Sequence, residues 1–225
     1  ISSVSWTCSP TRFASATGSL TAPANGVNLN GPAVALTSDS ADGGSGVATI
    51  VFEDSPSGAG TWTAQASPWT TTAVGDGLYD LRVTTTDNAG NGCTSATITV
   101  RGDNTAPATG PSASPGTTSN APVTVTLSAS DGSGSGVSAT QYRVDGGGWS
   151  AGTTIVIAAP GDHSNDGVHT IEFYSTDAVG NVESTQSIAI TIDTTGPSGT
   201  PGNPGSYLRG TAAALTFTPD TPADV

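Results

Sequence analysis

The chain has 225 residues, of which 34% are apolar, so it is long enough for one or two domains with buried cores. Its 30 glycines and 15 prolines, with a preference for threonine and serine and no methionine or lysine, are typical of a β-rich protein with many turns. Five basic residues against 18 acidic ones give a formal net charge of −13, which argues against nucleic acid or an anionic membrane as a partner.

The acidic residues are mostly aspartates, 15 of the 18. Aspartate shapes turns and coordinates calcium, whereas acids that cover helices would include more glutamate. Part of the excess simply keeps the protein soluble. No run of 18 apolar residues and no signal peptide are visible, so no membrane span is predicted. The chain opens on Ile1 rather than methionine, and we expect a removed leader or a longer parent protein.

Two cysteines, Cys8 and Cys93, are too few for a disulfide scaffold and lack the spacing of a zinc or redox motif. We expect a single disulfide between them, which would pin the N-terminal segment to the first domain and indicate an oxidising compartment. The alternative is a pair of free or intermolecular thiols.

The same residues recur along the chain at one fixed spacing. The matching pairs are Val47 and Val137, Asp87 and Asp177, Gly90 and Gly180, Asn91 and Asn181, Asp103 and Asp193, and Pro107 and Pro197, each separated by 90 positions. This spacing predicts a tandem array of units of that length.

Alternation of apolar and polar residues, broken by turn residues, predicts strands throughout both units. In the first unit the expected strands are 33–39, 47–54, 61–65, 77–87 and 94–103. In the second they are 110–116, 121–130, 138–145, 147–151, 153–160, 168–177 and 183–193. About seven strands in roughly 90 residues is the count of an immunoglobulin-like or fibronectin type III-like sandwich, so the predicted fold is all-β.

The repeat also predicts domain boundaries. We expect an N-terminal segment or the end of a preceding unit at 1–12, sandwiches at 13–103 and 108–193, linkers at 104–107 and 194–197, and an incomplete third unit at 198–225. Each linker is short and contains a proline, so neighbouring domains should touch.

The stretches "GLYDLRVTTTDNAGN" and "GVHTIEFYSTDAVGNVE", followed by "DNTAP" and "DTTGP", carry a family resemblance. They resemble the bacterial Ig-like repeats of large secreted and surface-anchored proteins, over roughly residues 13–225. The second is similar to the subtype first described in a leptospiral outer-membrane protein. The resemblance implies extracellular stalks, adhesins or spacers in secreted enzymes, some of which carry calcium at their junctions.

A motif D-x-x-G-N occurs at 87–91 and again at 177–181. In a seven-strand sandwich this loop and the end of the strand before Asp131 lie at the pole that faces the preceding domain. Asp103 and Asn104, which end the first unit, should therefore meet Asp131 and Asp177. Because calcium takes 6 to 8 oxygen ligands from carboxylates, amides and carbonyls, this junction is a candidate Ca²⁺ site.

The same reasoning places further candidate calcium ligands along the array. Asp193 and Asp220 would meet at the next junction, and Asp39, Asp42 and Asp87 would lie at the entry of the first domain. The alternative is that D-x-x-G-N only shapes a turn, since aspartate and asparagine cap turns and glycine accepts positive φ. The two interpretations are compatible.

No residue is assigned a catalytic role. His163 and His169 lack a third ligand and a counterpart in the first unit, and no G-x-S-x-G elbow accompanies the serines. In Arg101-Gly102-Asp103 only the aspartate repeats, and the tripeptide lies at a strand end rather than on a loop tip, which argues against receptor binding.

Tryptophans are the candidate binding surface. Trp62 and Trp149 follow glycine-rich turns at matching places, where packing on the sandwich edge competes with a carbohydrate-binding platform. Trp69 has no counterpart and fits neither reading clearly.

These features favour a non-enzymatic, extracellular or cell-surface structural array: a stalk, filament or appendage whose partners are neighbouring Ig-like units or copies of itself. The alternative is an adhesin or carbohydrate-binding module of a larger secreted protein, with a surface glycan or host receptor as partner. The stretch "TAAALTFTPD" at 211–220 could also pair with a sheet edge of the next subunit.

Overall fold

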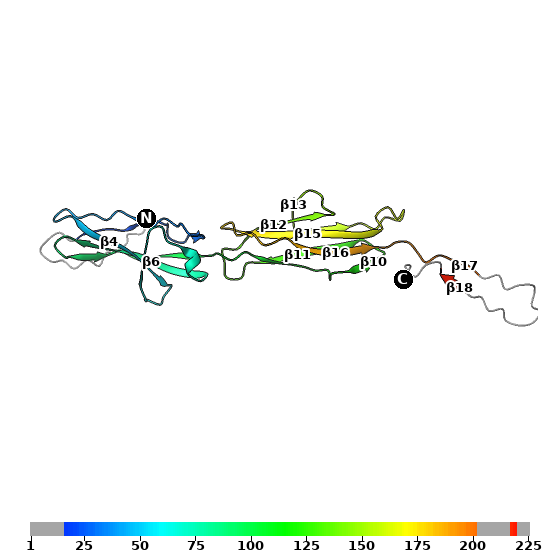
Figure 1. Cartoon of the computed structure of the whole chain (residues 1–225), viewed down its shortest axis with the longest axis horizontal. Helices are drawn as coiled ribbons and strands as arrows, with labels where there is room; N and C mark the ends of the chain where they lie inside the picture. The colour runs from blue at the N-terminus through cyan, green and yellow to red at the C-terminus, as the bar shows by residue number, and fades with distance from the viewer. Residues whose placement is uncertain (1–15, 202–216, 220–225) are drawn as a thin grey trace, which may run out of the picture. The chain divides into compact units, whose positions relative to one another are not determined.

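A computed structural model describes residues 16–201 and 217–219. The chain forms two compact units. Unit 1 runs to Thr109 and includes Ala129–Thr140 and Tyr174–Ser184, and unit 2 consists of Gly110–Ser128, Gln141–Phe173 and the residues from Thr185 onward. The fold is all-β, as predicted, and the one helix among the described residues is a short 3-10 turn, η1 (Thr71–Ala73) (Figure 1).

The first sandwich is built from eight strands. They are β1 (Leu20–Ala22), β2 (Asn28–Leu29), β3 (Thr37–Ser38), β4 (Val47–Pro56), β5 (Thr63–Gln65), β6 (Gly77–Asp87), β7 (Gly92–Thr94) and β8 (Ile98–Gly102). The larger sheet has the order β2-β8-β6-β4-β5, with β7 also paired to β6, and β1 pairs with β3 in the smaller sheet.

Strand β6 carries the core of the first sandwich on alternate residues. Leu81, Val83, Thr85 and Asp87 are buried and the residues between them are half-buried, because successive side chains of a strand point to opposite faces. Trp69, only 1% exposed, packs with Leu81 and Val100, and its ring meets that of Tyr79 edge-on at 5.7 Å. Trp69 is therefore a core residue.

The second sandwich repeats the plan with longer strands. They are β9 (Ala108–Pro111), β10 (Thr117–Ser119), β11 (Val123–Ser130), β12 (Val137–Val144), β13 (Ser150–Ala151), β14 (Thr154–Ile157), β15 (Gly167–Asp177) and β16 (Gln186–Ile192). One sheet has the order β10-β16-β15-β12-β13 and the other has the order β14-β11-β9.

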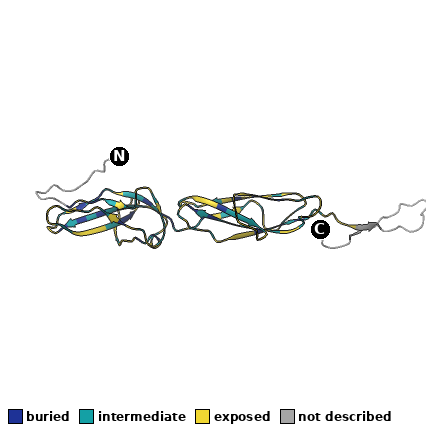
Figure 2. Cartoon of the chain, turned by 90° about the horizontal axis from the view of Figure 1, so that it is seen from above, coloured by how far each residue is buried: buried dark blue, intermediate teal, exposed yellow. Residues whose placement is uncertain are grey.

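The core of unit 2 lies between these two sheets and is almost entirely aliphatic. Its fully buried members are Val125, Leu127, Ile155, Ile157, Ile171, Phe173, Ile188, Ile190 and Ile192. They occupy every second position of β11, β14, β15 and β16, which is the alternation that the sequence shows (Figure 2).

Several predicted strands are confirmed, notably 77–87, which is β6, and 168–177, which is β15 with one more residue. The sequence did not reveal β2 and β10, which pair in parallel with β8 and β16. Both are only two or three residues long, too short to show alternation. The strand predicted at 33–39 is reduced to β3 and a single bridge from Val34 to Trp69.

The predicted domain boundaries stay predictions. Strand β8 ends at Gly102 and β9 begins at Ala108, as expected, but the compact units assign Ala129–Thr140 and Tyr174–Ser184 to unit 1. Segment 1–12, and with it Cys8, lies outside the described residues, as does Asp220. Cys93 is buried on β7, and its bridge to Cys8 stays a prediction.

Part of the segment predicted as a third unit, 198–225, is described. Strand β18 (Phe217–Pro219) pairs antiparallel with β17 (Gly199–Pro201) of the same chain. This pairing counts against donation of the 211–220 stretch to another subunit, because the described part of that stretch already has a partner strand. Among the described residues, no helix combines the length and apolar character that crossing a bilayer requires.

Candidate functional site

The two D-x-x-G-N loops fold as self-capped turns. Asp87 Oδ1 accepts hydrogen bonds from the backbone N–H groups of Ala89 at 2.9 Å and Asn91 at 2.8 Å, and its Oδ2 accepts one from the Asn91 side chain at 2.8 Å. Gly90 has a φ of 88°, a conformation that side chains other than glycine rarely adopt. The turn interpretation of the motif is therefore confirmed in the first sandwich.

The second loop has the same bonding. Asp177 Oδ1 accepts from the N–H groups of Val179, Gly180 and Asn181 at 2.7 to 2.9 Å, and the Asn181 side chain donates to Oδ2 at 2.7 Å. Gly180 takes a φ of 95°. The Asn181 amide also donates to the carbonyl of Asp103 at 3.0 Å, so this loop is tied to the segment that follows β8.

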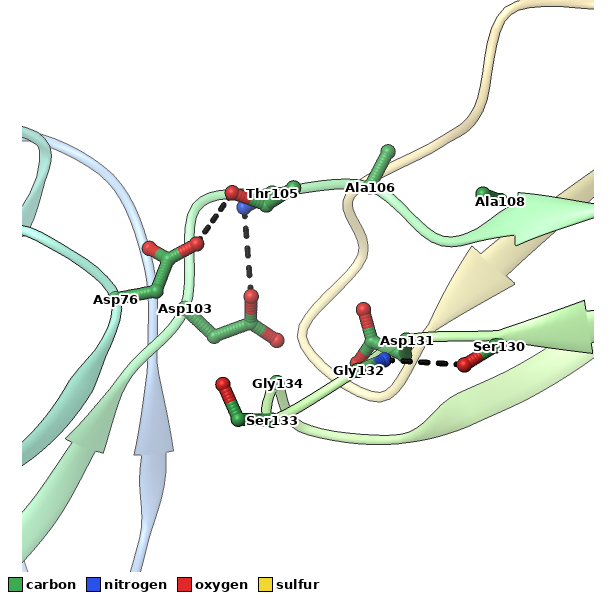
Figure 3. Close-up of a pocket in the computed structure, with 10 residues that line it drawn as sticks. All are labelled: Asp76, Asp103, Thr105, Ala106, Ala108, Ser130, Asp131, Gly132, Ser133 and Gly134. Atoms are coloured by element: carbon green, nitrogen blue, oxygen red, sulfur yellow. Dashed lines mark hydrogen bonds between the residues drawn. The ribbon is translucent and has the colours of Figure 1, made fainter.

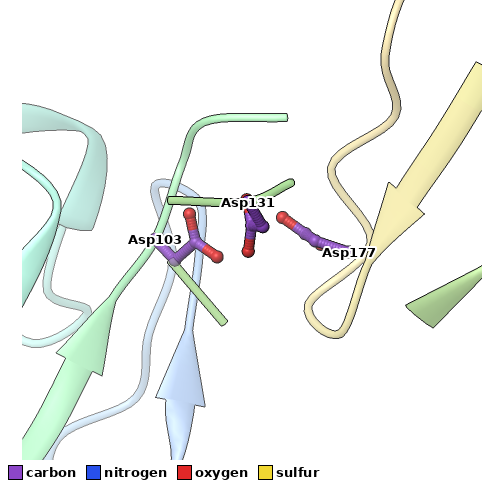
Figure 4. Close-up of side chains that lie close together, drawn as sticks. All are labelled: Asp103, Asp131 and Asp177. Atoms are coloured by element: carbon purple, nitrogen blue, oxygen red, sulfur yellow. The ribbon is translucent and has the colours of Figure 1, made fainter. Parts of the chain in front are cut away.

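Unit 1 brings three predicted calcium ligands together. Oxygens of Asp103, Asp131 and Asp177 all lie within 4.8 Å of one another (Figure 4). Asp103 follows β8, Asp131 follows β11 and Asp177 ends β15, so the group joins three segments that are far apart in the sequence. Asp103 is 0% and Asp177 2% exposed, so both carboxylates are held away from water.

Backbone donors position the carboxylates of Asp103 and Asp131 without filling their acceptor capacity, whereas Asp177 Oδ1 already accepts three N–H bonds. Ser135 N–H donates to Asp103 Oδ2 at 2.6 Å, Thr105 N–H to Asp103 Oδ1 at 3.3 Å, and Gly136 N–H to Asp131 Oδ2 at 2.6 Å. Each carboxylate oxygen can accept two bonds, so these oxygens keep lone pairs for another ligand.

The group also lacks a neutralising charge. Within the described ranges no arginine, lysine or histidine forms an ion pair with any of the three carboxylates. Ser135, whose backbone N–H binds Asp103, has a buried hydroxyl oxygen without a hydrogen-bond partner. Three neighbouring carboxylates form an all-oxygen donor set, which suits a hard divalent cation such as calcium.

A hollow of about 440 Å³ opens beside Asp103 and Asp131 (Figure 3). Its lining comes from unit 1: Asp76, Asp103, Thr105, Ala106, Ala108, Ser130, Asp131, Gly132, Ser133 and Gly134. The hollow gives water access to the half-buried Asp131, whereas the other two carboxylates of the group are enclosed.

Asn104, the fourth predicted ligand of this group, is engaged elsewhere. Its Oδ1 accepts from Gly31 N–H at 2.9 Å and from the Thr71 hydroxyl at 3.1 Å, and its Nδ2 donates to the Thr71 carbonyl at 3.2 Å and to Asp76 at 3.4 Å. Both ends of the amide are therefore used within the first sandwich.

Asp76 is a residue that the sequence analysis missed. It accepts from the Asn104 backbone N–H at 2.8 Å and from the Thr105 hydroxyl, so it clamps the chain directly after β8. Burial opposes ionisation of Asp76, but the hydrogen bonds from Thr105 and Asn104 outweigh it and hold its pKa below the usual value.

The second sandwich has the same clamp 90 positions later. Asp166 accepts from Thr194 N–H at 3.1 Å, from the Thr194 hydroxyl at 2.7 Å and from the Thr195 hydroxyl at 2.9 Å. The hydroxyl of Thr194 foremost lowers the pKa of Asp166. The repeat register, which pairs position 76 with 166, was the sequence signal that could have revealed both clamps.

The remaining candidate ligands that the structure describes form no comparable group. Asp39 accepts hydrogen bonds from the backbone N–H and the hydroxyl of Ser19. Asp42 Oδ2 accepts hydrogen bonds from the N–H groups of Gly44 and Gly46 within its own loop. Among the described residues, neither is brought together with Asp87 as a group of three possible metal ligands. Asp193 accepts from Thr195 N–H at 3.1 Å.

The Arg-Gly-Asp tripeptide and the two histidines were given no functional role on sequence grounds. Asp103 of the Arg-Gly-Asp tripeptide is fully buried, so it offers no receptor contact. The side chain of His163 is half exposed. His169 has both ring nitrogens engaged: its Nδ1 lies 2.8 Å from the carboxylate of Asp145, and its Nε2 lies 2.9 Å from the carbonyl of Asn165. The Asn165 carbonyl and then Asp145 raise the pKa of His169.

Trp62 and Trp149 both stack on arginine. The guanidinium carbon of Arg82 lies 3.9 Å from the ring centre of Trp62, and that of Arg143 lies 4.7 Å from Trp149. Trp62 is half-buried but Trp149 is 38% exposed, so packing and a carbohydrate-binding platform both stay predictions for these rings.

Comparison with solved structures finds fibronectin-like and Ig-like modules at low identity and low TM-score. The chain is similar to the fibronectin(III)-like modules of Clostridium thermocellum CbhA, with 17% identity, 78% of this chain and 94% of that chain covered, and a TM-score of 0.36. It is also similar to the D00-D0 domain of Intimin, with 11% identity, 78% and 100% coverage, and a TM-score of 0.38. The chicken CNTN1 FN1-FN3 domains match at 14% identity, covering 74% of this chain and 68% of theirs, with a TM-score of 0.32.

No family model matches the chain, and no curated protein matches it. The solved structures are fibronectin-like and Ig-like modules from several sources, and none tests the leptospiral subtype. At these identities the likeness concerns the fold alone. The sheet orders and the buried faces of the strands show by themselves that the chain consists of Ig-like or fibronectin type III-like β-sandwiches.

Proposed function

We propose that this protein is a non-enzymatic structural module of an extracellular repeat array, and that it binds calcium through Asp103, Asp131 and Asp177. The array would form a stalk, a filament or another surface appendage, with neighbouring Ig-like units or further copies of the chain as its partners. An oxidising compartment outside the cell would also permit the expected bridge between Cys8 and Cys93.

The observation that carries the calcium proposal is the group of three carboxylate oxygens within 4.8 Å, two of them on buried side chains. Without a cation, three carboxylates at this spacing repel one another in a region of reduced dielectric. Calcium would remove that repulsion and would take its remaining ligands from carbonyls, hydroxyls and water.

A bound ion would act mechanically. It would link the segment after β8 to the loops that begin at Asp131 and Asp177, all of which belong to unit 1. Because a cation that binds only the folded chain stabilises it by mass action, a hundredfold excess over the dissociation constant would add about 2.7 kcal/mol. The Asp76 clamp supports the same role, because it restrains the chain where it leaves the first sandwich.

The alternative, an adhesin or carbohydrate-binding module, has less support. A sugar platform needs aromatic faces that are open to a ligand. Trp69 is buried in the core, and an arginine lies over one face of Trp62 and one face of Trp149, although Trp149 stays 38% exposed.

Calcium binding is tested by thermal unfolding and titration calorimetry of the whole chain, with about 1–10 mM calcium or with a chelator, the range of weak extracellular sites. We expect calcium to raise the melting temperature of wild type and Asp131→Asn to abolish the shift. Asp131 is the most exposed of the three, so this variant should fold. Asp162→Asn, which makes the same charge change in a loop of unit 2, should keep the shift. An unchanged melting temperature in wild type would remove calcium from the proposal.

A further inference from the structure

Two cross-strand ion pairs occupy equivalent positions in the two sandwiches with their charges exchanged. In the first, Glu53 on β4 faces Arg82 on β6. In the second, Arg143 on β12 faces Glu172 on β15. Adding the repeat length of 90 to 53 and 82 gives 143 and 172, so each position keeps its role in the pair but carries the opposite charge.

Both pairs are well formed and partly shielded from water. Arg82 Nε lies 2.8 Å from Glu53, and Arg143 donates to both oxygens of Glu172 at 2.7 and 2.8 Å. The four side chains are between 19% and 31% exposed, and Trp62 and Trp149 cover the two guanidinium groups. The charges therefore interact more strongly than on an open surface.

The strands that carry the pairs are otherwise alike. From their fifth residue to their last, β6 and β15 have the same alternation of buried and half-buried positions, and both strands begin with glycine and end with Thr-Asp. β4 and β12 both begin with valine and carry an aromatic residue, Phe52 or Tyr142, directly before the charged position. In burial pattern β6 and β15 could therefore replace each other, whereas β4 and β12, of ten and eight residues, are alike only around the charged position.

Charge distinguishes the correct partner from the wrong one. If β4 paired with β15 in the same register, Glu53 would face Glu172, and if β12 paired with β6, Arg143 would face Arg82. Like charges directly opposite each other destabilise a strand pair, and partial burial strengthens the penalty. Exchange of strands between similar domains is a characteristic misfolding route of tandem repeats.

We infer that the exchanged ion pairs select the correct strand partner during folding, so that β4 and β6 reject their equivalents in the other sandwich and in a second copy of the chain. The inference does not depend on calcium or on the proposed function. It assigns a role to the reversed polarity itself, which native stability alone would not require, because either polarity forms a complementary pair.

Three variants of the full chain separate selection of the strand partner from stabilisation of the native pair. Glu53→Arg with Arg82→Glu gives the first sandwich the polarity of the second, and Arg143→Glu with Glu172→Arg gives the second the polarity of the first. Each double variant keeps complementary native pairs but also makes the mixed pairs complementary. The quadruple variant reverses both sandwiches, so that the mixed pairs repel again.

The measurement is refolding from denaturant over a range of protein concentrations, with the folded monomer separated from misfolded and associated species by size exclusion. We expect the non-native fraction to rise several-fold in either double variant and to return to the wild-type level in the quadruple variant. About 1 M salt, which shortens the screening length to about 3 Å, should reduce the differences.

The quadruple variant is decisive because it carries the most substitutions. If it refolded no better than the double variants, damage to the native pairs would explain the losses and the inference would be wrong. Refolding of both double variants at the wild-type yield would also overturn it, whatever their melting temperatures.

Discussion

The two sandwiches share their turns and differ in their cores. The loops of Asp87 and Asp177 are bonded alike, as are the clamps of Asp76 and Asp166, whereas Trp69 fills the first core at a position that is Ala159 in the second. The second core needs no such residue, because β11 and β14 present alternating aliphatic side chains to the opposite sheet. The comparison shows that hydrogen-bonded turns hold the register of a repeat while different sets of side chains fill its interior.

Removing the largest buried side chain of each core is expected to have the largest effect. Trp69→Ala should lower the free energy of unfolding of unit 1, and Phe173→Ala that of unit 2, by about 3–5 kcal/mol each, through lost burial and a cavity. Calorimetry of the whole chain should show one transition fall in each variant. Trp69→Phe should cost less, because the indole N–H has no hydrogen-bond partner in the described structure. A single transition that falls equally in all three variants would contradict two separately packed cores.

The paired turns distinguish capping from calcium binding. Asp87→Ala and Asp177→Ala each leave backbone N–H groups without their acceptor and should lower the melting temperature by several degrees in a chelator. Of the two, only Asp177 belongs to the group with Asp103 and Asp131. We therefore expect added calcium to stabilise the Asp87→Ala variant as it does wild type, but not the Asp177→Ala variant. An equal calcium response in both variants would mean that Asp177 has only a turn role.

The smallest expected effect is a pH dependence confined to unit 2. His169 lies between two acceptors, the carbonyl of Asn165 and the carboxylate of Asp145, so only its protonated form donates to both. Because these contacts raise its pKa in the folded state, the stabilisation is complete below the unfolded pKa of about 6.5 and is lost as pH rises through the folded pKa.

The urea midpoint of the unit 2 transition should accordingly be higher at pH 6 than at pH 8, with the difference removed in His169→Gln. The hydrogen bond from His169 foremost lowers the pKa of its partner Asp145, so that carboxylate stays ionised across this window. A midpoint that falls equally in wild type and variant would assign the pH dependence to another group.

Much of the fold follows from local patterns in the sequence. Strands β6 and β15 are long and alternate strictly, so their limits could be predicted almost to the residue. The 90-residue register likewise fixed the two D-x-x-G-N turns, because aspartate, glycine and asparagine at those positions carry their own hydrogen bonds and their own backbone conformation.

The sequence by itself determined the β-sandwich class, the repeat and the turns, since each depends on residues close together in the chain. Strand counting also placed Asp103 near Asp131 and Asp177, as the structure has them. Only the tertiary structure decided that Asn104 turns toward Thr71 instead and that Trp69 is buried. These outcomes depend on side chains that come from distant segments, and local alternation carries no information about which of them meet.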